Sequence, residues 1–458
     1  MTQGNEGEQT FLKERRRARL DSYRSSPEDI AAHHSDEGQI QSDYHQRFAF
    51  ELIQNADDAM AETAGKRTVR FELHDGVLLV ANTGRPIVEE DVKALCTMSY
   101  TTKRSEEDRR ASIGHKGRGF SSVLEITDRP QVFSTGISFE FHEERSREAI
   151  ASLVAKLDGI SMDELPGIPL MRLPFEPEAT PERVEQLFNE GYKTVFRFDL
   201  KDPRVEQDVR ATMNSLDRDT ALFLRTLKRL ELSPERGVEQ GWWVARDSRD
   251  IESDRTELKF VTVGPLAMEG ETNETFALFS RNDIKIGRHT GGIDENTWGD
   301  VEYTEVGVAT LVEEQEGDIH LRPLSERPNV HVFLPTEEQS PVPLLMNGAF
   351  HTAISRTSIN VTGESDNYNR FLLGEVAELL ATDIRRYCET TATTVEEFLG
   401  LLDITHLDEE ALARNDRLQG RFAQALRGHL GDTEFIPRVA DTDVKESPRQ
   451  SVRQTIQT

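Results

Sequence analysis

Three polar residues at helical spacing are the best candidates for chemistry in this chain. Glu51, Asn55 and Asp58 lie at i, i+4 and i+7 within YHQRFAFELIQNADDAM, residues 44–60. This spacing places them along one stripe of a helix, whereas the apolar residues between them form a separate, wide arc. A helix packed by that arc would hold two carboxylates and an amide over a neighbouring surface. Taken alone, the stretch leaves a solvated polar face open as the alternative.

A second stretch with chemical potential is rich in glycine. IGHKGRGF places Gly114, Gly117 and Gly119 directly before the apolar start of a helix. Backbone N–H groups without side chains can approach a phosphate closely, and a helix N-terminus attracts anions. A simple tight turn explains these glycines equally well. Two other features of the chain support the phosphate interpretation. The polar stripe of Glu51, Asn55 and Asp58 precedes the glycine-rich stretch, and an Asn-x-Gly turn at residues 82–84 lies between the stripe and the glycines.

The elements that would position these residues alternate between helix and strand. TVRFELHDG and VLLVAN meet at Asp75-Gly76, a dipeptide that predicts a β-hairpin. A short helix should follow, with Glu89, Glu90 and Asp91 in its first turn, and the polar region 97–111 predicts a flap. KTVFRFDL predicts a strand that closes the first domain near residue 205.

The rest of the chain predicts a second domain of strands and helices. From about residue 206 to 232 the chain has a helical pattern, which includes DTALFLRTLKRLEL, and several strand candidates succeed it. A long helix is expected from Tyr368 to about Cys388, and residues 394–429 look helical and amphipathic. Residues 1–43 are polar and helix-prone, with a basic run that is best explained as a solvated arm.

Composition limits the classes of function. The 458 residues favour two or three domains. The 83 acidic residues outnumber the 55 basic ones, of which twelve are Lys, giving a net charge of -28. This balance fits a high-salt cytosol and argues against nucleic acid as the main ligand. The mean hydropathy is -0.58, and the polar N-terminus and lack of a long apolar run predict a cytoplasmic protein without a membrane partner.

Three stretches occur in an order that resembles a known superfamily. ELIQNADDA, VANTGRPI and IGHKGRGFSSVLEITDRPQVFS are similar to the boxes of the GHKL ATPases, which include gyrase, heat-shock chaperones, histidine kinases and MutL. The sequences of these stretches are most similar to sacsin-type ATP-binding regions, and the resemblance covers roughly residues 44–200. It implies an α/β fold of the Bergerat type, with helices on one face of a mixed sheet and ATP and Mg²⁺ between them.

The resemblance also implies a role for each matching residue. Asn55 would bind Mg²⁺, which prefers hard oxygen ligands. Glu51 would activate the attacking water as a general base, and Asp58 would support the nucleotide from the same helix. The phosphates would be wrapped by Gly114, Gly117 and Gly119 with charge from Lys103, Lys116 and Arg118, and further nucleotide contacts would come from Asn82, Gly84, Phe120 and Thr194.

Three positions depart from the superfamily pattern or extend it. Asn82 stands where an aspartate usually recognises adenine, and Pro86 replaces a glycine. An amide carbonyl can still accept from the adenine amine, but it lacks the charge, so adenine specificity stays open. NGAFHTAISRTSINV resembles a middle-domain segment whose arginine reaches the γ-phosphate, which nominates Arg356. An ordinary loop arginine is the alternative.

The sequence therefore predicts a polar helical arm (1–43), an ATP-binding domain (44–205), a middle α/β domain (206–392) and a helical segment with a polar tail (393–458). The expected function is that of a slow Mg²⁺-dependent ATPase whose domains move like a clamp. It would act with a protein client in chaperone-like remodelling or prokaryotic defence, and a homodimer stays open. The alternatives are a nucleotide sensor without hydrolysis and a DNA-processing ATPase of the MutL or gyrase kind.

Overall fold

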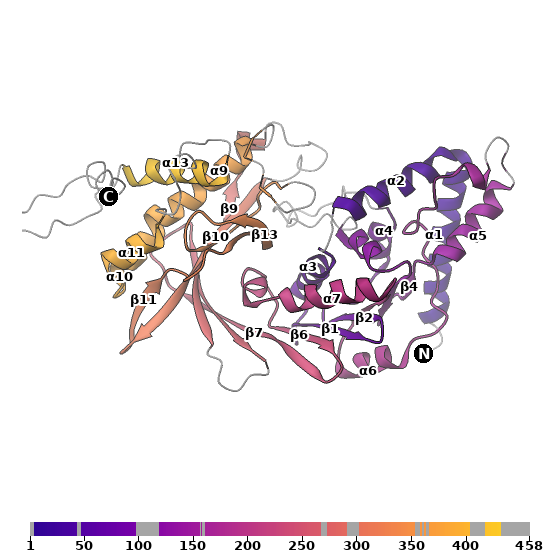
Figure 1. Ribbon diagram of the computed structural model, residues 1–458, viewed down its shortest axis with the longest axis horizontal. Helices are drawn as coiled ribbons and strands as arrows, with labels where there is room; N and C mark the ends of the chain where they lie inside the picture. Colours follow the sequence, from indigo (N-terminus) through magenta and orange to yellow (C-terminus); the bar gives the residue numbers. More distant parts are fainter. Residues whose placement is uncertain are drawn as a thin grey trace, which may run out of the picture. The chain divides into compact units, whose positions relative to one another are not determined.

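The chain is mixed α/β and divides into two compact units. The computed structural model describes residues 4–43, 47–97, 119–155, 157, 161–266, 273–290, 302–352, 358–359, 361–362, 366–403 and 417–431. These described residues form eleven α-helices and fourteen β-strands (Figure 1). Of them, those up to 97, 119–243 and 265–266 belong to the first unit and the others to the second. The domain boundaries near residues 205 and 392 stay predictions.

The first unit is built on a mixed sheet with the strand order β7-β6-β1-β2-β5-β3-β4. β1 and β6 run parallel, whereas the other neighbouring strands are antiparallel. The strands are β1 (Thr68–His74), β2 (Val77–Asn82), β3 (Pro130–Ser134), β4 (Phe139–Glu140), β5 (Thr194–Asp199), β6 (Arg229–Glu235) and β7 (Val238–Arg249).

The hairpin predicted at Asp75-Gly76 is confirmed. Asp75 has φ 51° and Gly76 has φ 74°, and the residues on either side pair as β1 and β2. Two consecutive left-handed residues match the right-handed twist of the flanking strands, which is why this dipeptide suits a two-residue turn. The turn fixes the register that carries Asn82 to the end of β2.

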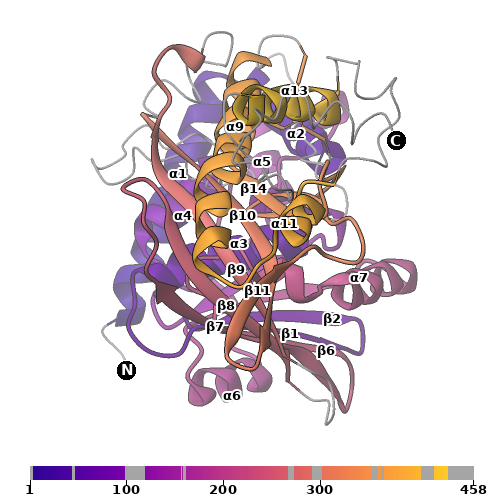
Figure 2. The same cartoon turned by 90° about the vertical axis from the view of Figure 1, so that its left-hand side faces the viewer.

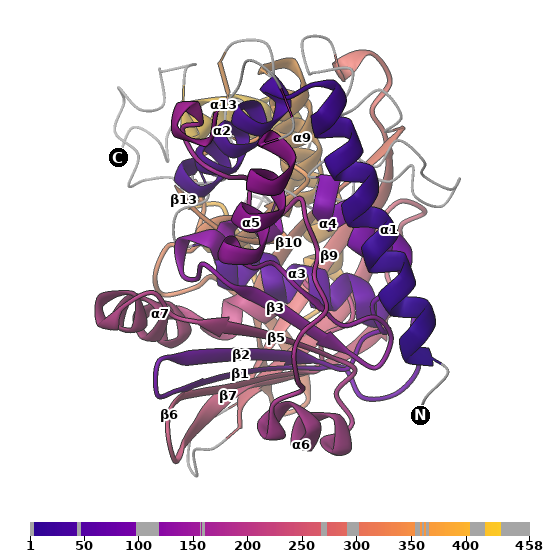
Figure 3. The same ribbon diagram turned by 90° about the vertical axis from the view of Figure 1, so that its right-hand side faces the viewer.

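Helices lie on both faces of this sheet. Figure 3 shows α3 (Phe48–Ala61) on one face and α6 (Glu182–Glu190) on the other. α6 packs Leu187 into a cluster with Leu79 and Val195 of the sheet, so the expectation of helices on one face alone does not hold for this unit. The unit also contains α1 (Gly4–Ser25), α2 (Glu28–Asp43), α4 (Glu89–Thr97), the 3₁₀ helix η2 (Gly119–Glu125), α5 (Glu143–Val154) and α7 (Pro203–Ser215).

The helix predicted from about residue 206 to 232 is present only in its first part, as α7 (Pro203–Ser215). The structure has a short 3₁₀ turn at Arg218–Ala221, and the strand β6 begins at Arg229. Between them, the backbone N–H groups of residues 225–227 donate to the buried carboxylate of Asp57 on α3 instead of to helix carbonyls. Parallel pairing of β6 with β1 then fixes the following residues as a strand. Long-range contacts have overridden a local helical pattern.

The N-terminal helices bury an acidic side chain. Glu37 on α2 is 4% exposed, and its carboxylate accepts the backbone N–H groups of Leu170 at 2.6 Å and Met171 at 3.0 Å. Burial raises the pKa of Glu37 to about 7, against the lowering effect of those two hydrogen bonds. The folded protein therefore holds a proton on this carboxyl group at pH values where the unfolded chain has released it.

This raised pKa predicts a pH-dependent stability. Because the pKa of Glu37 is higher in the folded state, its contribution is fully present below about pH 4.5 and is lost as the pH rises through about 7. The free energy of unfolding of the wild type should fall over this window by up to roughly 3 kcal/mol relative to Glu37→Gln. Urea unfolding of both proteins between pH 4.5 and 7.5 measures this difference, and parallel curves would contradict it.

In the second unit the strands follow the order β13-β12-β14-β10-β9-β8, and β11 pairs with β10. Figure 2 shows α9 lying across these strands, and its apolar residues belong to one buried cluster with those of the strands. The strands are β8 (Glu257–Pro265), β9 (Glu274–Lys285), β10 (Tyr303–Gln315), β11 (Asp318–Arg322), β12 (Asn329–Val332), β13 (Leu334–Gln339) and β14 (Leu345–Gly348). Its helices are α9 (Asp366–Leu379), α10 (Arg385–Thr390), α11 (Val395–Leu401) and α13 (Leu418–Gly431).

The long helix predicted from Tyr368 to Cys388 is present and contains one π-helical turn, Leu380–Ile384. Asp383 in that turn accepts hydrogen bonds from Arg281 at 2.6 Å and from the Thr256 hydroxyl at 2.7 Å. These buried contacts accompany the wider turn. Among the described helices, none is long and apolar enough to cross a membrane.

Candidate functional site

A row of polar side chains crosses three neighbouring strands of the first unit. Asn82 at the end of β2 pairs with Thr194 on β5, and Thr194 pairs with Ser134 on β3. Because side chains alternate along a strand, all three point to the same face, together with Phe196 two residues after Thr194. This is the face covered by α3 and η2, since Phe196 contacts Phe120 of η2 with ring centroids 5.4 Å apart.

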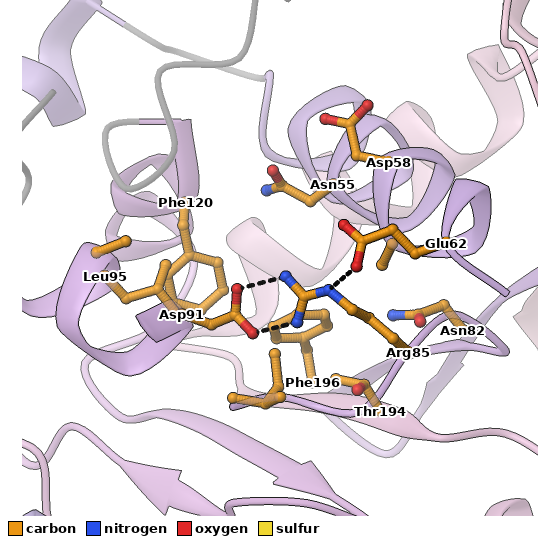
Figure 4. A pocket seen from close by; sticks show the side chains of 13 residues that line it. Asn55, Asp58, Glu62, Asn82, Arg85, Asp91, Leu95, Phe120, Thr194 and Phe196 are labelled. Atoms are coloured by element: carbon orange, nitrogen blue, oxygen red, sulfur yellow. Dashed lines mark hydrogen bonds and ion pairs between the residues drawn. The ribbon is translucent and has the colours of Figure 1, made fainter. Parts of the chain in front are cut away.

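A hollow of about 750 Å³, including its open mouth, lies over this row. The strands form its floor, α3 and α4 form two walls, and η2 and the turn after β2 close the remaining sides (Figure 4). The lining residues are Asn55, Asp58, Ala59, Glu62, Asn82, Arg85, Ile87, Asp91, Ala94, Leu95, Phe120, Thr194 and Phe196.

Five residues chosen from the sequence meet in this hollow: Asn55, Asp58, Asn82, Phe120 and Thr194. They come from four segments of the chain, and the first and the last of these segments are more than 130 residues apart. Figure 4 shows the Asn55 amide directed into the space above Arg85 and Phe120, with Asp58 at the outer rim. Their gathering in one place is observed, and their roles stay predictions.

Other predicted residues do not line the hollow. Glu51 lies on α3 one turn before Asn55, but it is 4% exposed and is absent from the lining. Gly84 packs against α3 so closely that a Cβ there would lie 2.7 Å from the Cβ of Ala59, which requires a glycine. Gly119 is the first residue of η2. Outside the described residues lie Lys103, Gly114, Lys116, Gly117, Arg118, Arg356 and residues 98–111 of the predicted flap.

Arg85 is a lining residue for which the sequence predicted no role. Its guanidinium reaches across the hollow, with Nη2 2.8 Å from Asp91 Oδ1 and Nε 2.8 Å from Glu62 Oε2 (Figure 4). The hydrogen bond to Asp91 is the main cause that holds the pKa of Arg85 above its ordinary value. Its backbone N–H also donates to Ala59 O at 3.0 Å. The sequence contained one indication of this site, because its partner Glu62 lies four residues after Asp58, in line with the stripe of Glu51, Asn55 and Asp58.

The polar row on the floor is tied to the neighbouring turns. The side-chain carbonyl of Asn82 accepts the backbone N–H of Gly84 at 3.0 Å. Ser134 Oγ accepts the N–H of Ile87 at 2.9 Å and lies 3.4 Å from the Thr194 hydroxyl. An amide oxygen has two lone pairs, so Asn82 keeps capacity for a second donor. The turn after β2 is thus held to both the floor and α3.

The described lining is acidic. It contains the carboxylates of Asp58, Glu62 and Asp91 but only one cation, Arg85. A polyanionic ligand would need positive charge from another source to enter it. Among the described residues, no group of three or more His, Cys, Asp or Glu side chains could hold a metal ion alone. Oxygen atoms of Asn55 and Asp58 could complete the coordination of a hard cation whose other ligands come from the bound molecule or water.

The chain is similar to a known protein over a short stretch. No family model matches the chain. A stretch of 94 residues is 35% identical to Protein NO VEIN of Arabidopsis thaliana. The match covers 20% of this chain and 3% of that protein, so the chain corresponds to a very small part of this relative's length.

Proposed function

We propose that the first unit binds ATP as its magnesium complex in the hollow between α3, α4 and the sheet, and hydrolyses it slowly. The observation that carries the proposal is that one hollow is lined by Asn55, Asn82 and Phe120. Each comes from a different one of the three stretches that resemble the GHKL superfamily. The proposed fold of this unit is accordingly of the Bergerat type, with α6 as an addition on the second face.

The lining suggests an orientation for the nucleotide. The base would lie over Phe196 beside Asn82 and Thr194, where hydrogen-bonding and aromatic groups meet. The phosphates would lie toward Asn55 and Phe120, because η2 begins at Gly119, the last glycine of the predicted phosphate-binding stretch. Bound Mg²⁺ would offset the charge of the phosphates, and the oxygens of Asn55 and Asp58 would orient the complex.

Calorimetric titration with ATP tests the binding proposal. With Mg²⁺ we expect a dissociation constant in the micromolar to millimolar range, roughly that of typical enzyme substrates. Replacement of Mg²⁺ by EDTA should weaken binding at least about tenfold, because the free polyanion would face an acidic lining. Absence of binding at millimolar MgATP, at a salt concentration where the protein is folded, would reject the proposal.

Hydrolysis is tested by Glu51→Gln. The substitution keeps the shape of the side chain and removes the proposed general base, so phosphate release should fall by roughly 10²- to 10⁴-fold while the affinity for MgATP is retained. Glu90→Gln is the matched control, since it changes an exposed carboxylate on α4 that is absent from the lining. Equal turnover in the wild type and Glu51→Gln would end the enzyme proposal.

A nucleotide sensor without turnover is the second candidate. The burial of Glu51 outside the lining favours it, because a general base must reach a water molecule beside the phosphates. This candidate predicts tight MgATP binding with no Glu51-dependent phosphate release. Clamp-like movement, a protein client, and remodelling or defence remain proposals that depend on this choice.

A further inference from the structure

One buried arginine, Arg172, links the N-terminal helix α2 to a wall of the hollow. Arg172 is 3% exposed and lies in the connection between α5 and α6. Its Nη1 donates to the backbone carbonyls of Cys96, at 3.4 Å, and Thr97. These two carbonyls belong to the last turn of α4, so the guanidinium occupies the C-terminal end of that helix.

The other side of the same guanidinium faces α2. Its Nε lies 3.8 Å from Glu37 Oε1, and its Nη2 lies 3.9 Å from Asp36 Oδ2. Glu37 also accepts the backbone N–H groups of Leu170 and Met171, the two residues immediately before Arg172. Glu37 therefore holds the backbone just before Arg172 by hydrogen bonds and lies within ion-pair distance of its guanidinium.

α4 is one of the two helical walls, so a contact at its end affects the hollow. It contributes Asp91, Ala94 and Leu95 to the lining. The last carbonyls of a helix have no partners inside the helix, and a cation placed there satisfies them and interacts favourably with the helix dipole. At the opposite end, Asp91 pairs with Arg85 and accepts the N–H of Val88 at 3.0 Å. Polar contacts thus anchor α4 at both ends.

We propose that Arg172, oriented by Glu37, is a positioning residue for the ligand site. It fixes the C-terminal end of α4 and thereby makes the affinity of the hollow depend on α1 and α2, which pack on each other and hold Glu37 in place. The part that concerns the ligand depends on the proposed binding of MgATP. The part that concerns α4 does not, because its contacts are present without a ligand.

The first arm of the experiment uses no ligand. In hydrogen exchange of the whole chain, Arg172→Met should raise the exchange rate of the α4 amides by about tenfold, the equivalent of one charged hydrogen bond. The amides of α3 should keep their protection, and Arg172→Lys should restore part of that of α4, because an ammonium group can still reach one carbonyl. Unchanged exchange in α4, or an equal rise throughout the first unit, would overturn the proposal.

The second arm measures the affinity for MgATP. Arg172→Met should raise the dissociation constant by about tenfold and Arg172→Lys by less, although no residue of the lining is altered. Arg183→Met is the matched control, since Arg183 also pairs with a buried carboxylate, Glu72, but lies on α6 at the opposite face.

The two arms separate the outcomes. If the wild type binds MgATP and the Arg172→Met and Arg183→Met proteins bind it with equal affinity, the inference is overturned and the proposed function stands. If the wild type fails to bind MgATP, the proposed function falls, and the exchange data alone decide whether Arg172 positions α4.

Discussion

Replacing Asp57 with alanine is expected to lower the free energy of unfolding of the first unit by about 4 kcal/mol. The carboxylate is buried and accepts the backbone N–H groups of Arg225, Thr226 and Leu227 at 2.9, 2.9 and 2.7 Å. The Thr226 hydroxyl also donates to Oδ1 of Asp57, at 2.6 Å. Truncation would leave these donors buried without an acceptor, and each such group costs about 1–3 kcal/mol.

Asp58→Ala is the control for this prediction, because its side chain lies at the exposed rim of the hollow. It should change stability by no more than about 0.5 kcal/mol. Thermal unfolding should therefore show a drop of about 10 °C for Asp57→Ala and almost none for Asp58→Ala. Asp57→Asn should fall between them, since the amide retains one acceptor oxygen. Similar midpoints for the two alanine variants would contradict the role assigned to Asp57.

Replacing Asn55 with alanine is expected to weaken MgATP binding by roughly 30- to 100-fold, with little change in stability. The amide is half-buried and directed into the hollow, and it is the group best placed to contact a hydrated Mg²⁺ beside the phosphates. Its loss would remove a contact to a charged ligand without opening the apolar core, because the core side of α3 is formed by other residues.

Asn55→Asp distinguishes metal binding from general packing. The substitution keeps an oxygen ligand but adds a negative charge to an acidic lining. Binding should therefore be retained with Mg²⁺ and should be weaker than in the wild type without it. Calorimetric titrations of ATP with and without Mg²⁺ provide the comparison. An Asn55→Ala protein with the same affinity and the same Mg²⁺ dependence as the wild type would remove Asn55 from the proposed site.

Much of the candidate site could be predicted because its residues follow local patterns. Asn55 and Asp58 share a stripe on a helix whose apolar arc packs inward, and alternation along β2 and β5 places Asn82 and Thr194 on one face. Arg85 could not be predicted in the same way. Its position depends on Asp91 of α4 and on Glu62, the residue after α3, and a single sequence does not show which charges will meet.

Asp57 and Asp58 show most clearly what could not be predicted from the sequence. Asp57 and Asp58 have the same side chain, and the motif alone draws attention to Asp58. Tertiary structure decides that Asp57 lies on the buried side of α3, where its carboxylate accepts the backbone N–H groups of residues 225–227. The same contact turns a segment with a helical pattern into an extended connection to β6.

The sequence by itself determined the elements whose stability is local: the amphipathic α3, the Asp75-Gly76 hairpin and the strand that carries Thr194. Periodicity and turn chemistry act between residues close in the chain, so they can be recognised without a structure. Only the tertiary structure decided the burial of Glu51, the ion pairs of Arg85 and the position of Arg172 between α2 and α4. Desolvation and charge pairing depend on distances between segments far apart in sequence, which local patterns do not specify.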